Sequence, residues 1–406
     1  MKKIEDKAFD FSAKLRQQSV LGRLKDYIVW QRALRSGNQD VSLPGFSPVS
    51  VNLDLTTACN FACPHCVDSG IINTGEYLDL ENIKSSIDRL KSSGLLSVIL
   101  IGGGEPTLHR DFEDIVRFIK ERDLQLGLVT NGVRLDRVFP VADLMSDHDW
   151  VRISIDAARE ETFIRAHRPK QKQVGLRMIL NNARELKRLN SEVSLGYSFV
   201  IVWDGIEVMG QELCPNVEEI SEAVKLAREY SFDFISYKPC LLRLDGSRKE
   251  TLFDKPDILR ETRIIDAIRE NLAKAEREAG VAVKILQSVN LQAMLDRKVH
   301  ELKKQPRFCH MQFFRTVLSP AGIFHCPAFR GVEKAKFAPS TGYMDDAQFD
   351  GVMGDLEHSI QDFDASRECD VVACFYHHVN WWVENFIVSG RDIDEIEEVG
   401  DTNFFL

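Results

Sequence analysis

The sequence contains no uninterrupted run of about 18 apolar residues, the length that a membrane-spanning helix requires. Its first residues, MKKIEDKAFDF, carry charges where a secretion signal would need an apolar stretch. It also has no low-complexity segment and no internal repeat beyond a strand and helix alternation. These absences indicate a globular, cytoplasmic protein that makes no use of a membrane.

Basic residues are in deficit as well. The chain has 52 Lys and Arg against 62 Asp and Glu, which gives a net charge of -10. Such a surface repels the phosphate backbone of nucleic acids, so nucleic acid is disfavoured as a partner. With 406 residues, 44% of them hydrophobic, the chain is long enough for a large α/β domain and a smaller second one.

The nine cysteines are unevenly distributed. In a reducing cytoplasm, cysteines serve more often as metal ligands or buried thiols than as disulfides. Three crowd together, four lie in the last quarter and two stand apart, namely Cys59, Cys63 and Cys66, then Cys309, Cys326, Cys369 and Cys374, and finally Cys214 and Cys240. This distribution predicts two metal sites and two spare thiols.

Short, β-branched segments alternate with helical patterns from Ser50 onward, which is typical of a parallel sheet with crossover helices. The predicted strands cover residues 51–55, 97–101, 124–129, 150–155, 194–202 and 232–237. Six strand and helix units are too few for a closed eight-stranded barrel. We therefore expect an α/β fold built on a partial barrel of parallel strands, with its site at their C-terminal ends.

The pattern also predicts a division of the chain. Leu21, Leu24, Ile28 and Leu34 follow helical spacing, which predicts a helical extension that packs on the main domain rather than on a membrane surface. A long helical stretch runs from about Pro256 to Ala279. The expected parts are a helical extension with a linker (1–48), the partial barrel (49–300), a small cysteine-rich domain containing a β-hairpin (301–385) and an acidic tail (386–406).

The first cysteine group follows the first strand directly, with the spacing C-x3-C-x2-C at Cys59, Cys63 and Cys66. Three thiolates on one loop can hold three irons of a four-iron cluster and leave the fourth iron open to an external ligand. Zinc would require a fourth protein ligand, and His65 is poorly placed to complete the same tetrahedron. The loop therefore predicts an iron–sulfur cluster with an open coordination position.

This spacing resembles the signature of the radical S-adenosylmethionine (SAM) superfamily, in which the open iron binds the amino and carboxylate groups of SAM. The family usually has an aromatic residue before the third cysteine, where this chain has His65. The second strand ends in Gly102-Gly103-Gly104-Glu105, which resembles the family's GGE motif for the SAM amino group. Glycines let the backbone approach a ligand closely, and no G-K-[ST] follows, so a Walker nucleotide site is not indicated.

Further matches to the family follow at the next strand ends. Thr130 and Asn131 resemble a turn common in the family, although an ordinary Asn-Gly turn explains them equally well. Ser154 and Asp156 lie two residues apart, so we expect them to share a face and to contact SAM as in the family. Arg165 resembles a family arginine that pairs with the SAM carboxylate, and the alternative is an arginine at the solvated surface.

The second cysteine group surrounds a predicted hairpin that turns at Ser319–Gly322 between Cys309 and Cys326. Cys369 and Cys374 follow as a C-x4-C pair. Four thiolates suit zinc or a fully ligated iron–sulfur cluster, and spacing alone does not decide between them. The region resembles the auxiliary-cluster part of SPASM and twitch radical SAM enzymes, and with four cysteines it matches the twitch form with one auxiliary 4Fe-4S cluster.

The resemblance implies an oxidoreductase with SAM and two 4Fe-4S clusters as cofactors. It implies that a low-potential donor such as flavodoxin or ferredoxin supplies one electron, and that cleavage of SAM yields a radical that removes hydrogen from a small molecule or a peptide. An auxiliary cluster would relay an electron from the substrate, which favours dehydrogenation over redox-neutral epimerisation or rearrangement. Cys240 is a candidate hydrogen-atom or proton donor or else a buried thiol. An iron–sulfur electron-transfer protein without SAM and a zinc-holding scaffold are the rivals from other classes.

Overall fold

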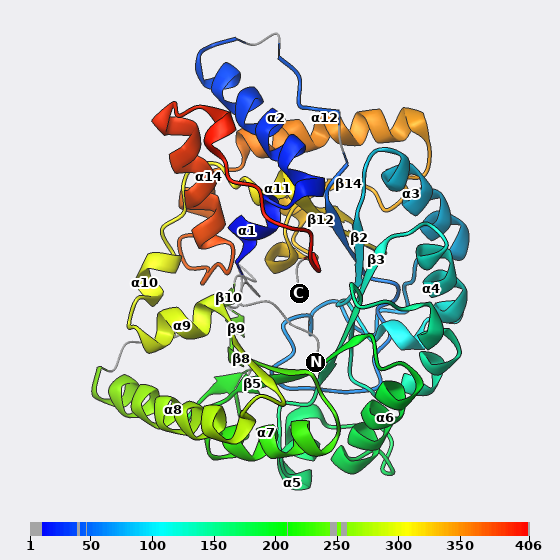
Figure 1. Ribbon diagram of the computed structural model, residues 1–406, viewed down its shortest axis with the longest axis vertical. Helices are drawn as coiled ribbons and strands as arrows, with labels where there is room; N and C mark the ends of the chain where they lie inside the picture. Colours follow the sequence, from blue (N-terminus) through cyan, green and yellow to red (C-terminus); the bar gives the residue numbers. More distant parts are fainter. Residues whose placement is uncertain are drawn as a thin grey trace.

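The computed structural model describes residues 10–38, 41–45, 47–208, 210–243, 250–252 and 258–404. In this part of the chain, ten strands form one curved sheet in the order β11-β8-β5-β4-β3-β2-β1-β12-β13-β14 (Figure 1). The first eight strands in this order are parallel, and β13 and β14 are antiparallel to their neighbours. The sheet keeps two free ends, so it is a partial barrel as expected, although it has eight parallel strands instead of the six that the sequence predicts.

The strands of the sheet are short. Their bounds are β1 (Ser50–Leu53), β2 (Ser97–Leu100), β3 (Gln125–Thr130), β4 (Trp150–Ser154), β5 (Ser194–Ile201), β8 (Phe234–Pro239), β11 (Lys284–Gln287), β12 (Arg315–Ser319), β13 (Gly322–Phe324) and β14 (Lys336–Ala338). Two further small pairs join β6 (Glu207–Val208) to β7 (Gln211–Glu212) and β9 (Leu242–Arg243) to β10 (Glu250–Thr251).

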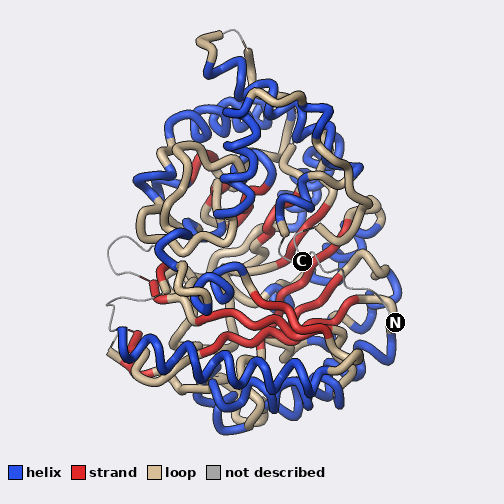
Figure 2. Tube along the Cα trace, turned by 60° about the vertical axis from the view of Figure 1, so that its left-hand side comes forward, coloured by secondary structure: helices blue, strands red, loops and turns tan. Residues whose placement is uncertain are grey.

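Helices pack against the sheet along its length (Figures 1 and 2). The larger ones are α2 (Gln18–Arg35), α3 (Leu80–Ser92), α4 (Phe112–Lys120), α5 (Glu160–His167), α6 (Leu176–Leu189), α7 (Ile220–Glu229), α8 (Ile258–Ala279), α12 (Asp346–Asp362) and α14 (His377–Ser389). Shorter ones are α1 (Phe11–Leu15), α9 (Val289–Leu295), α10 (Val299–Leu302), α11 (Met311–Phe314) and α13 (Ala365–Glu368). Asp79 caps α3 by accepting from the Asn82 amide at 2.8 Å, as the sequence predicts. The predicted start of the long helix at Pro256 lies outside the described residues.

All six strands expected from the sequence are present, each with a boundary shift of at most two residues. Two more parallel strands, β11 and β12, lengthen the sheet beyond the six. The hairpin of β12 and β13 forms as predicted, with Ser319 opposite Gly322. However, β12 also pairs in parallel with β1, from Ser50 opposite Arg315 to Leu53 opposite Leu318. The cysteine-rich region thus contributes strands to the main sheet instead of forming a sheet of its own.

The N-terminal helices pack against the C-terminal part of the chain. Leu21, Leu24 and Ile28 of α2 are buried, in keeping with the expected packing of this helix on the protein. Tyr27 stacks on Phe313 with ring centroids 4.7 Å apart. The segment after α14 runs back along α1 and α2, where the Gln18 amide donates to the Val399 carbonyl at 3.1 Å. The first and last described segments therefore pack against each other.

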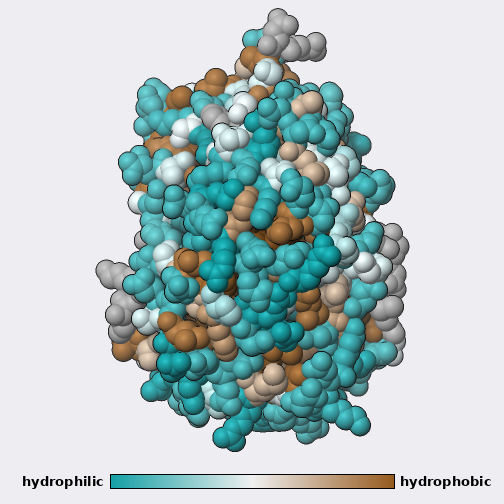
Figure 3. Space-filling model, turned by 90° about the vertical axis from the view of Figure 1, so that its right-hand side faces the viewer, coloured by the Kyte–Doolittle hydropathy of each residue, from teal (hydrophilic) through white to brown (hydrophobic). Residues whose placement is uncertain are grey.

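None of the described helices combines the length and the apolarity that crossing a membrane would take. One face of the molecule, drawn in Figure 3, is mostly hydrophilic and is broken by small apolar areas near its middle.

Candidate active site at the C-terminal ends of the parallel strands

The cysteine loop leaves β1 and is fixed by hydrogen bonds from two directions. The Cys59 amide donates to Asn73 Oδ1 at 2.9 Å, and Lys170 Nζ donates to the Cys59 carbonyl at 2.7 Å. The Cys66 amide donates to the Cys63 carbonyl at 3.1 Å. Burial raises the pKa of the Cys63 thiol, and the nearby thiols of Cys66 and Cys59 raise it further. The structure thus brings the three predicted ligands together on one loop.

The three thiols of this loop do not all lie within 4.8 Å of one another. Zinc holds its sulfur ligands at about 2.3 Å and gathers them tightly around itself. Among the described residues, the one group of three candidate ligands whose donor atoms all lie within 4.8 Å of one another is His65, Asp156 and His167, and it contains no cysteine. In the described part of the chain, no three sulfur atoms of either cysteine group lie as close together as the ligands of one zinc ion.

The glycine turn after β2 lies directly against this loop. A Cβ atom at Gly104 would lie 2.5 Å from the carbonyl oxygens of both Ala58 and Thr56, closer than real atoms approach. The Glu105 amide donates to the Ala58 carbonyl at 2.8 Å. Gly102 and Gly103 have φ angles of +75° and +64°, which side chains rarely permit. The contact between the two motifs therefore depends on glycine.

Glu105 joins the ends of β2 and β3. Its buried carboxylate accepts hydrogen bonds from the Thr130 hydroxyl at 2.6 Å, from the Asn131 amide at 2.7 Å and from the amide and hydroxyl of Thr107. Burial raises the pKa of Glu105, and these hydrogen bonds oppose the rise. The Asn131 side chain donates to Asn60 Oδ1 at 2.6 Å, within the cysteine loop. Glu105, Thr130 and Asn131 thus position the loop and the turn relative to each other.

Asp156 lies just beyond β4 with a left-handed φ of +53°. Its carboxylate accepts from the Val200 amide at 2.7 Å and lies 3.4 Å from His65 Nε2 and 3.6 Å from His167 Nε2. Burial alone would raise the pKa of Asp156, but the hydrogen bond from His65 and the charges of His167 and His65 lower it. Ser154 ends β4 and keeps accessible surface.

His65 is therefore anchored at the position where the resembled family has an aromatic ring. His65 and Arg165 also line a pocket of about 120 Å³, together with Pro64, Ala166, Arg168, Val202, Glu212, Leu213 and Cys214. Arg165 itself is exposed on α5. Sequence reasoning missed His167, whose Nδ1 lies 3.3 Å from the Cys63 sulfur, because a lone histidine gives no spacing signal.

The four C-terminal thiols pack into one small apolar cluster. Cys309, Cys326 and Cys374 pack against it, and Cys369 belongs to it together with Val317, Phe324, Phe329, Ala335, Ala365 and Val372. Asn380 Nδ2 donates to the Cys309 sulfur at 3.8 Å. His310 is hydrogen-bonded to Tyr27 and Glu384, so both its nitrogens are engaged away from these thiols. Four thiols within one apolar cluster fit a fully ligated four-iron cluster.

Arg330 connects the two cysteine regions. It follows Cys326 by a short turn, and its guanidinium pairs with Asp54 at 2.5 Å and with Asp68 at 3.1 Å. The Gly103 amide donates to Asp68 at 3.4 Å. No sequence motif predicts this contact, because its partners are far apart along the chain.

The two spare thiols have different surroundings. Cys240 is buried, its sulfur contacts the Leu241 carbonyl at 3.7 Å, and burial raises its pKa to about 12. Cys214 is half-buried at the pocket beside His65.

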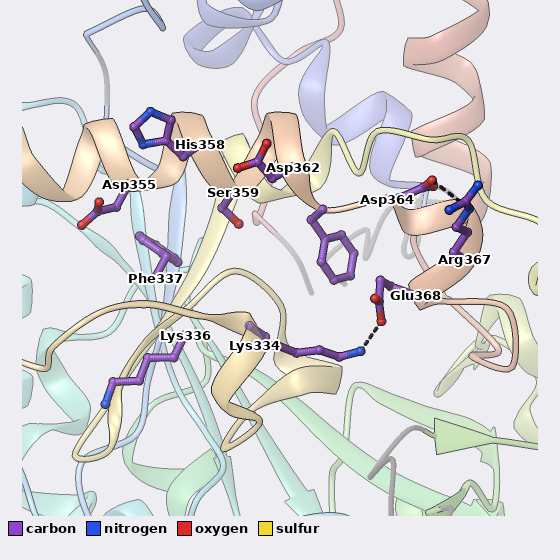
Figure 4. Close-up of a pocket in the computed structure, with 12 residues that line it drawn as sticks. Lys334, Lys336, Phe337, Asp355, His358, Ser359, Asp362, Asp364, Arg367 and Glu368 are labelled. Atoms are coloured by element: carbon purple, nitrogen blue, oxygen red, sulfur yellow. Dashed lines mark hydrogen bonds and ion pairs between the residues drawn. The ribbon is translucent and has the colours of Figure 1, made fainter.

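A separate hollow of about 530 Å³ lies between β14, α12 and α13 (Figure 4). Its lining mixes both charges, and the ion pairs Lys334–Glu368 and Arg367–Asp364 cross its rim. It lies apart from the glycine turn and the first cysteine loop.

Comparison with known proteins agrees with this geometry. Residues 53–207 match the model of the Radical SAM superfamily. The sequence is 37% identical over 115 residues to the S-adenosylmethionine-dependent nucleotide dehydratase of Selenomonas ruminantium, which is 28% of this chain and 41% of that protein. It is 35% identical over 115 residues to the mycofactocin maturase MftC of Mycolicibacterium smegmatis, which is 28% of this chain and 29% of that protein. The chain thus matches less than half the length of these relatives.

Solved structures resemble the fold over most of the chain. Streptococcus suis SuiB bound to S-adenosylmethionine superposes with a TM-score of 0.57 at 14% identity, covering 91% of this chain and 80% of SuiB. The protein anSMEcpe with bound AdoMet gives a TM-score of 0.53 at 15% identity, covering 87% and 96%. Residues 53–207 of this chain therefore match a radical SAM domain, in agreement with the resemblance of the cysteine loop. The predicted cofactors, SAM and iron–sulfur clusters, agree with it.

Proposed function

We propose that this protein is a radical SAM enzyme whose first 4Fe-4S cluster is held by Cys59, Cys63 and Cys66. The observation that carries the proposal is the fit of the Gly104 backbone against the carbonyls of Ala58 and Thr56, which joins the two motifs at one end of the sheet. A cluster reduced by one electron, together with SAM, supplies a 5′-deoxyadenosyl radical that removes a hydrogen atom from the substrate.

The chain's own residues bind and orient the reactants in this proposal. The backbone of Gly102, Gly103 and Gly104 offers carbonyls to the SAM ammonium group without interfering side chains. Glu105 holds this turn through Thr130 and Asn131. The other SAM contacts that we propose come from Ser154, Asp156 and Arg165. His65, held by Asp156, takes the place of the family's aromatic ring.

We assign the auxiliary 4Fe-4S cluster to Cys309, Cys326, Cys369 and Cys374. A cluster with four protein ligands has no open position for substrate, so its role would be to relay an electron. This supports an oxidative reaction, such as dehydrogenation, and the low-potential donor would be a flavodoxin or ferredoxin. Cys240 is the proposed hydrogen donor, because its raised pKa keeps the thiol protonated at neutral pH.

Two comparisons bear on the class of the substrate. SuiB has been solved with the precursor peptide SuiA, and anSMEcpe with the Cp18Cys peptide. The relative from Selenomonas ruminantium is a nucleotide dehydratase. A peptide or a small molecule is accordingly proposed as the substrate.

Anaerobic reconstitution tests the proposal. Iron and sulfide are quantified, and 5′-deoxyadenosine is assayed from SAM with a strong reductant. We expect about eight irons per chain, and about four in a variant with Cys59, Cys63 and Cys66 changed to Ala, which also loses cleavage. Cys214→Ala is the matched control for iron content, because this thiol belongs to neither group. Zinc without iron would reject the proposal, and iron without cleavage would favour an electron-transfer protein.

The auxiliary site needs its own test. A variant with Cys369 and Cys374 changed to Ala should contain about four irons and still form 5′-deoxyadenosine, because the first loop is intact. If it retained about eight irons, these thiols would not be cluster ligands.

A further inference from the structure

The inner face of the sheet keeps open space near the strand ends and is closed below them. Inward-facing residues at the C-terminal ends of successive strands retain accessible surface, namely Ile101, Val129, Ser154, Val200 and Lys238. Their inward neighbours one layer deeper are buried, namely Ile99, Gly127, Arg152, Ser198 and Ser236. The buried layer therefore forms the floor of the proposed reaction site. The accessible side chains directly above this floor can contact a ligand.

Cations lie at and just below this floor. Val151 and Ile153 of β4 pack toward the covering helices, so Arg152 between them points inward. In the same way, Ile235 and Tyr237 of β8 pack outward and Lys238 points inward. β5 separates these two strands, with Gly196 opposite Arg152 and Val200 opposite Lys238. The charge of Arg152 lowers the pKa of Lys238, so the long side chains of the two residues approach each other diagonally across β5.

A third cation faces them. The charge of Arg315 on β12 lowers the pKa of Arg152, so the two side chains lie near each other although three strands separate β12 from β4. Arg315 donates to Asn52 Oδ1 at 3.0 Å and to the Tyr376 hydroxyl at 2.8 Å.

Arg152 and the nearby Ser236 each have a polar group without a hydrogen-bond partner among the described residues. Arg152 is 9% exposed, and its Nε has no hydrogen-bond partner among the described residues. The same holds for the hydroxyl of Ser236, which is fully buried below Lys238. Asp156 is the carboxylate that attracts both Arg152 and Lys238, and His65 and His167 also contact it. Positive charge therefore exceeds negative charge at this floor.

Unneutralised buried cations destabilise a folded protein, so such a group is typical of a binding site rather than of a core. A ligand anion would complete the set, because Arg and Lys are the residues that bind phosphate and carboxylate groups. We propose that Arg152 and Lys238 form an anion-binding subsite that takes a phosphate or carboxylate group of the substrate. This inference rests on the proposed function, since it places the substrate at the same end of the sheet.

Thermal unfolding of the reconstituted full chain tests the subsite. Inorganic pyrophosphate and malonate are titrated at constant ionic strength, with chloride as the reference salt. We expect one of them to raise Tm saturably, and its identity separates a phosphate from a carboxylate ligand. Arg152→Gln and Lys238→Met should each weaken this binding at least tenfold. Arg188→Gln and Lys172→Met, at exposed positions, should leave it unchanged.

Three outcomes would overturn the proposal. They are the absence of any saturable shift beyond chloride, an unchanged shift in Lys238→Met, and displacement of the anion by SAM. The last would assign the cations to the SAM carboxylate. The assay requires no SAM cleavage, so it is independent of the test of the proposed function. Cleavage without anion binding rejects the subsite alone, and anion binding without cleavage rejects the reaction alone.

Discussion

The guanidinium of Arg330 lies 3.1 Å from the carboxylate of Asp68, which joins the turn after Cys326 to the loop after Cys66. The same guanidinium lies over Gly102, where a Cβ atom would come within 2.6 Å of it. One buried side chain therefore ties both cysteine regions to the glycine turn.

Replacing Arg330 with Gln should destabilise the protein strongly. The change leaves the buried carboxylates of Asp54 and Asp68 without their cation, and breaking a buried ion pair in this way costs about 3–5 kcal/mol. Urea unfolding measures the loss, with Arg367→Gln as the control because the Arg367 side chain is 84% exposed. A loss as small as that of the control would show that Arg330 does not hold the loops together.

Gly104→Ala should abolish SAM cleavage and weaken the first cluster. Its methyl group would collide with backbone oxygens of Thr56 and Ala58, which cannot move aside as a flexible side chain would. The measurements are 5′-deoxyadenosine formation and iron content. Gly354→Ala is the matched control, since nothing lies within 4 Å of its added carbon. Because Gly354 lies within α12, its replacement should stabilise the protein by about 0.5–1 kcal/mol. Cleavage at the wild-type rate in Gly104→Ala would contradict the proposed contact.

Two variants of Thr130 test the hydrogen bond from its hydroxyl to Glu105. Thr130→Val keeps the shape of the side chain but removes the donor to a buried carboxylate, which should cost about 1–3 kcal/mol. Thr130→Ser keeps the hydroxyl and should retain most of the stability. SAM affinity, measured by calorimetry, should follow the same order. Equal stability of the two variants would mean that the hydroxyl contributes nothing.

The sequence predicts most of the fold because its signals are local. The six β-branched segments, the Asp79 cap and the hairpin at Ser319–Gly322 each depend on neighbouring residues, and all are present. The parallel pairing of β12 with β1 is long-range, and no pattern within β12 distinguishes it from an ordinary hairpin strand. The sequence therefore predicts the hairpin but not its pairing with β1.

In the candidate site as well, the sequence predicts the residues that have a local motif and misses those whose contacts are long-range. Cysteine spacing and the glycine run point to their residues directly. Arg330 and the cations Arg152 and Lys238 have no motif, because their partners come from distant strands and loops. Asp156 was expected to share a face with Ser154, but its left-handed φ turns the carboxylate toward Val200, His65 and His167.

Replacing Tyr27 should destabilise the protein next to Cys309. Its hydroxyl lies 2.9 Å from Nδ1 of the buried His310, the residue after Cys309. Tyr27→Phe leaves that nitrogen without its partner and should cost about 1–3 kcal/mol in urea unfolding. Tyr77→Phe is the control, because Tyr77 is 51% exposed. If both variants lost the same small amount, α2 would not depend on this contact.

Lys238→Met should make the ligand-free protein more stable at neutral pH. Burial lowers the pKa of Lys238 well below its ordinary value, repulsion from Arg152 lowers it further, and Asp156 opposes both effects. Between this lowered pKa and the ordinary lysine value of about 10.4, the unfolded chain binds more protons than the folded one, so wild-type stability rises with pH. The methionine variant lacks this contribution.

The advantage of Lys238→Met should therefore be largest at low pH and shrink as the pH rises through that window. Urea unfolding of both proteins at several pH values from neutrality to about 10 measures it. The exposed Lys172→Met should show no pH-dependent difference from wild type. A wild type more stable than Lys238→Met at neutral pH would mean that Lys238 is already neutralised within the fold, and the charge excess at the floor of the site would then be absent.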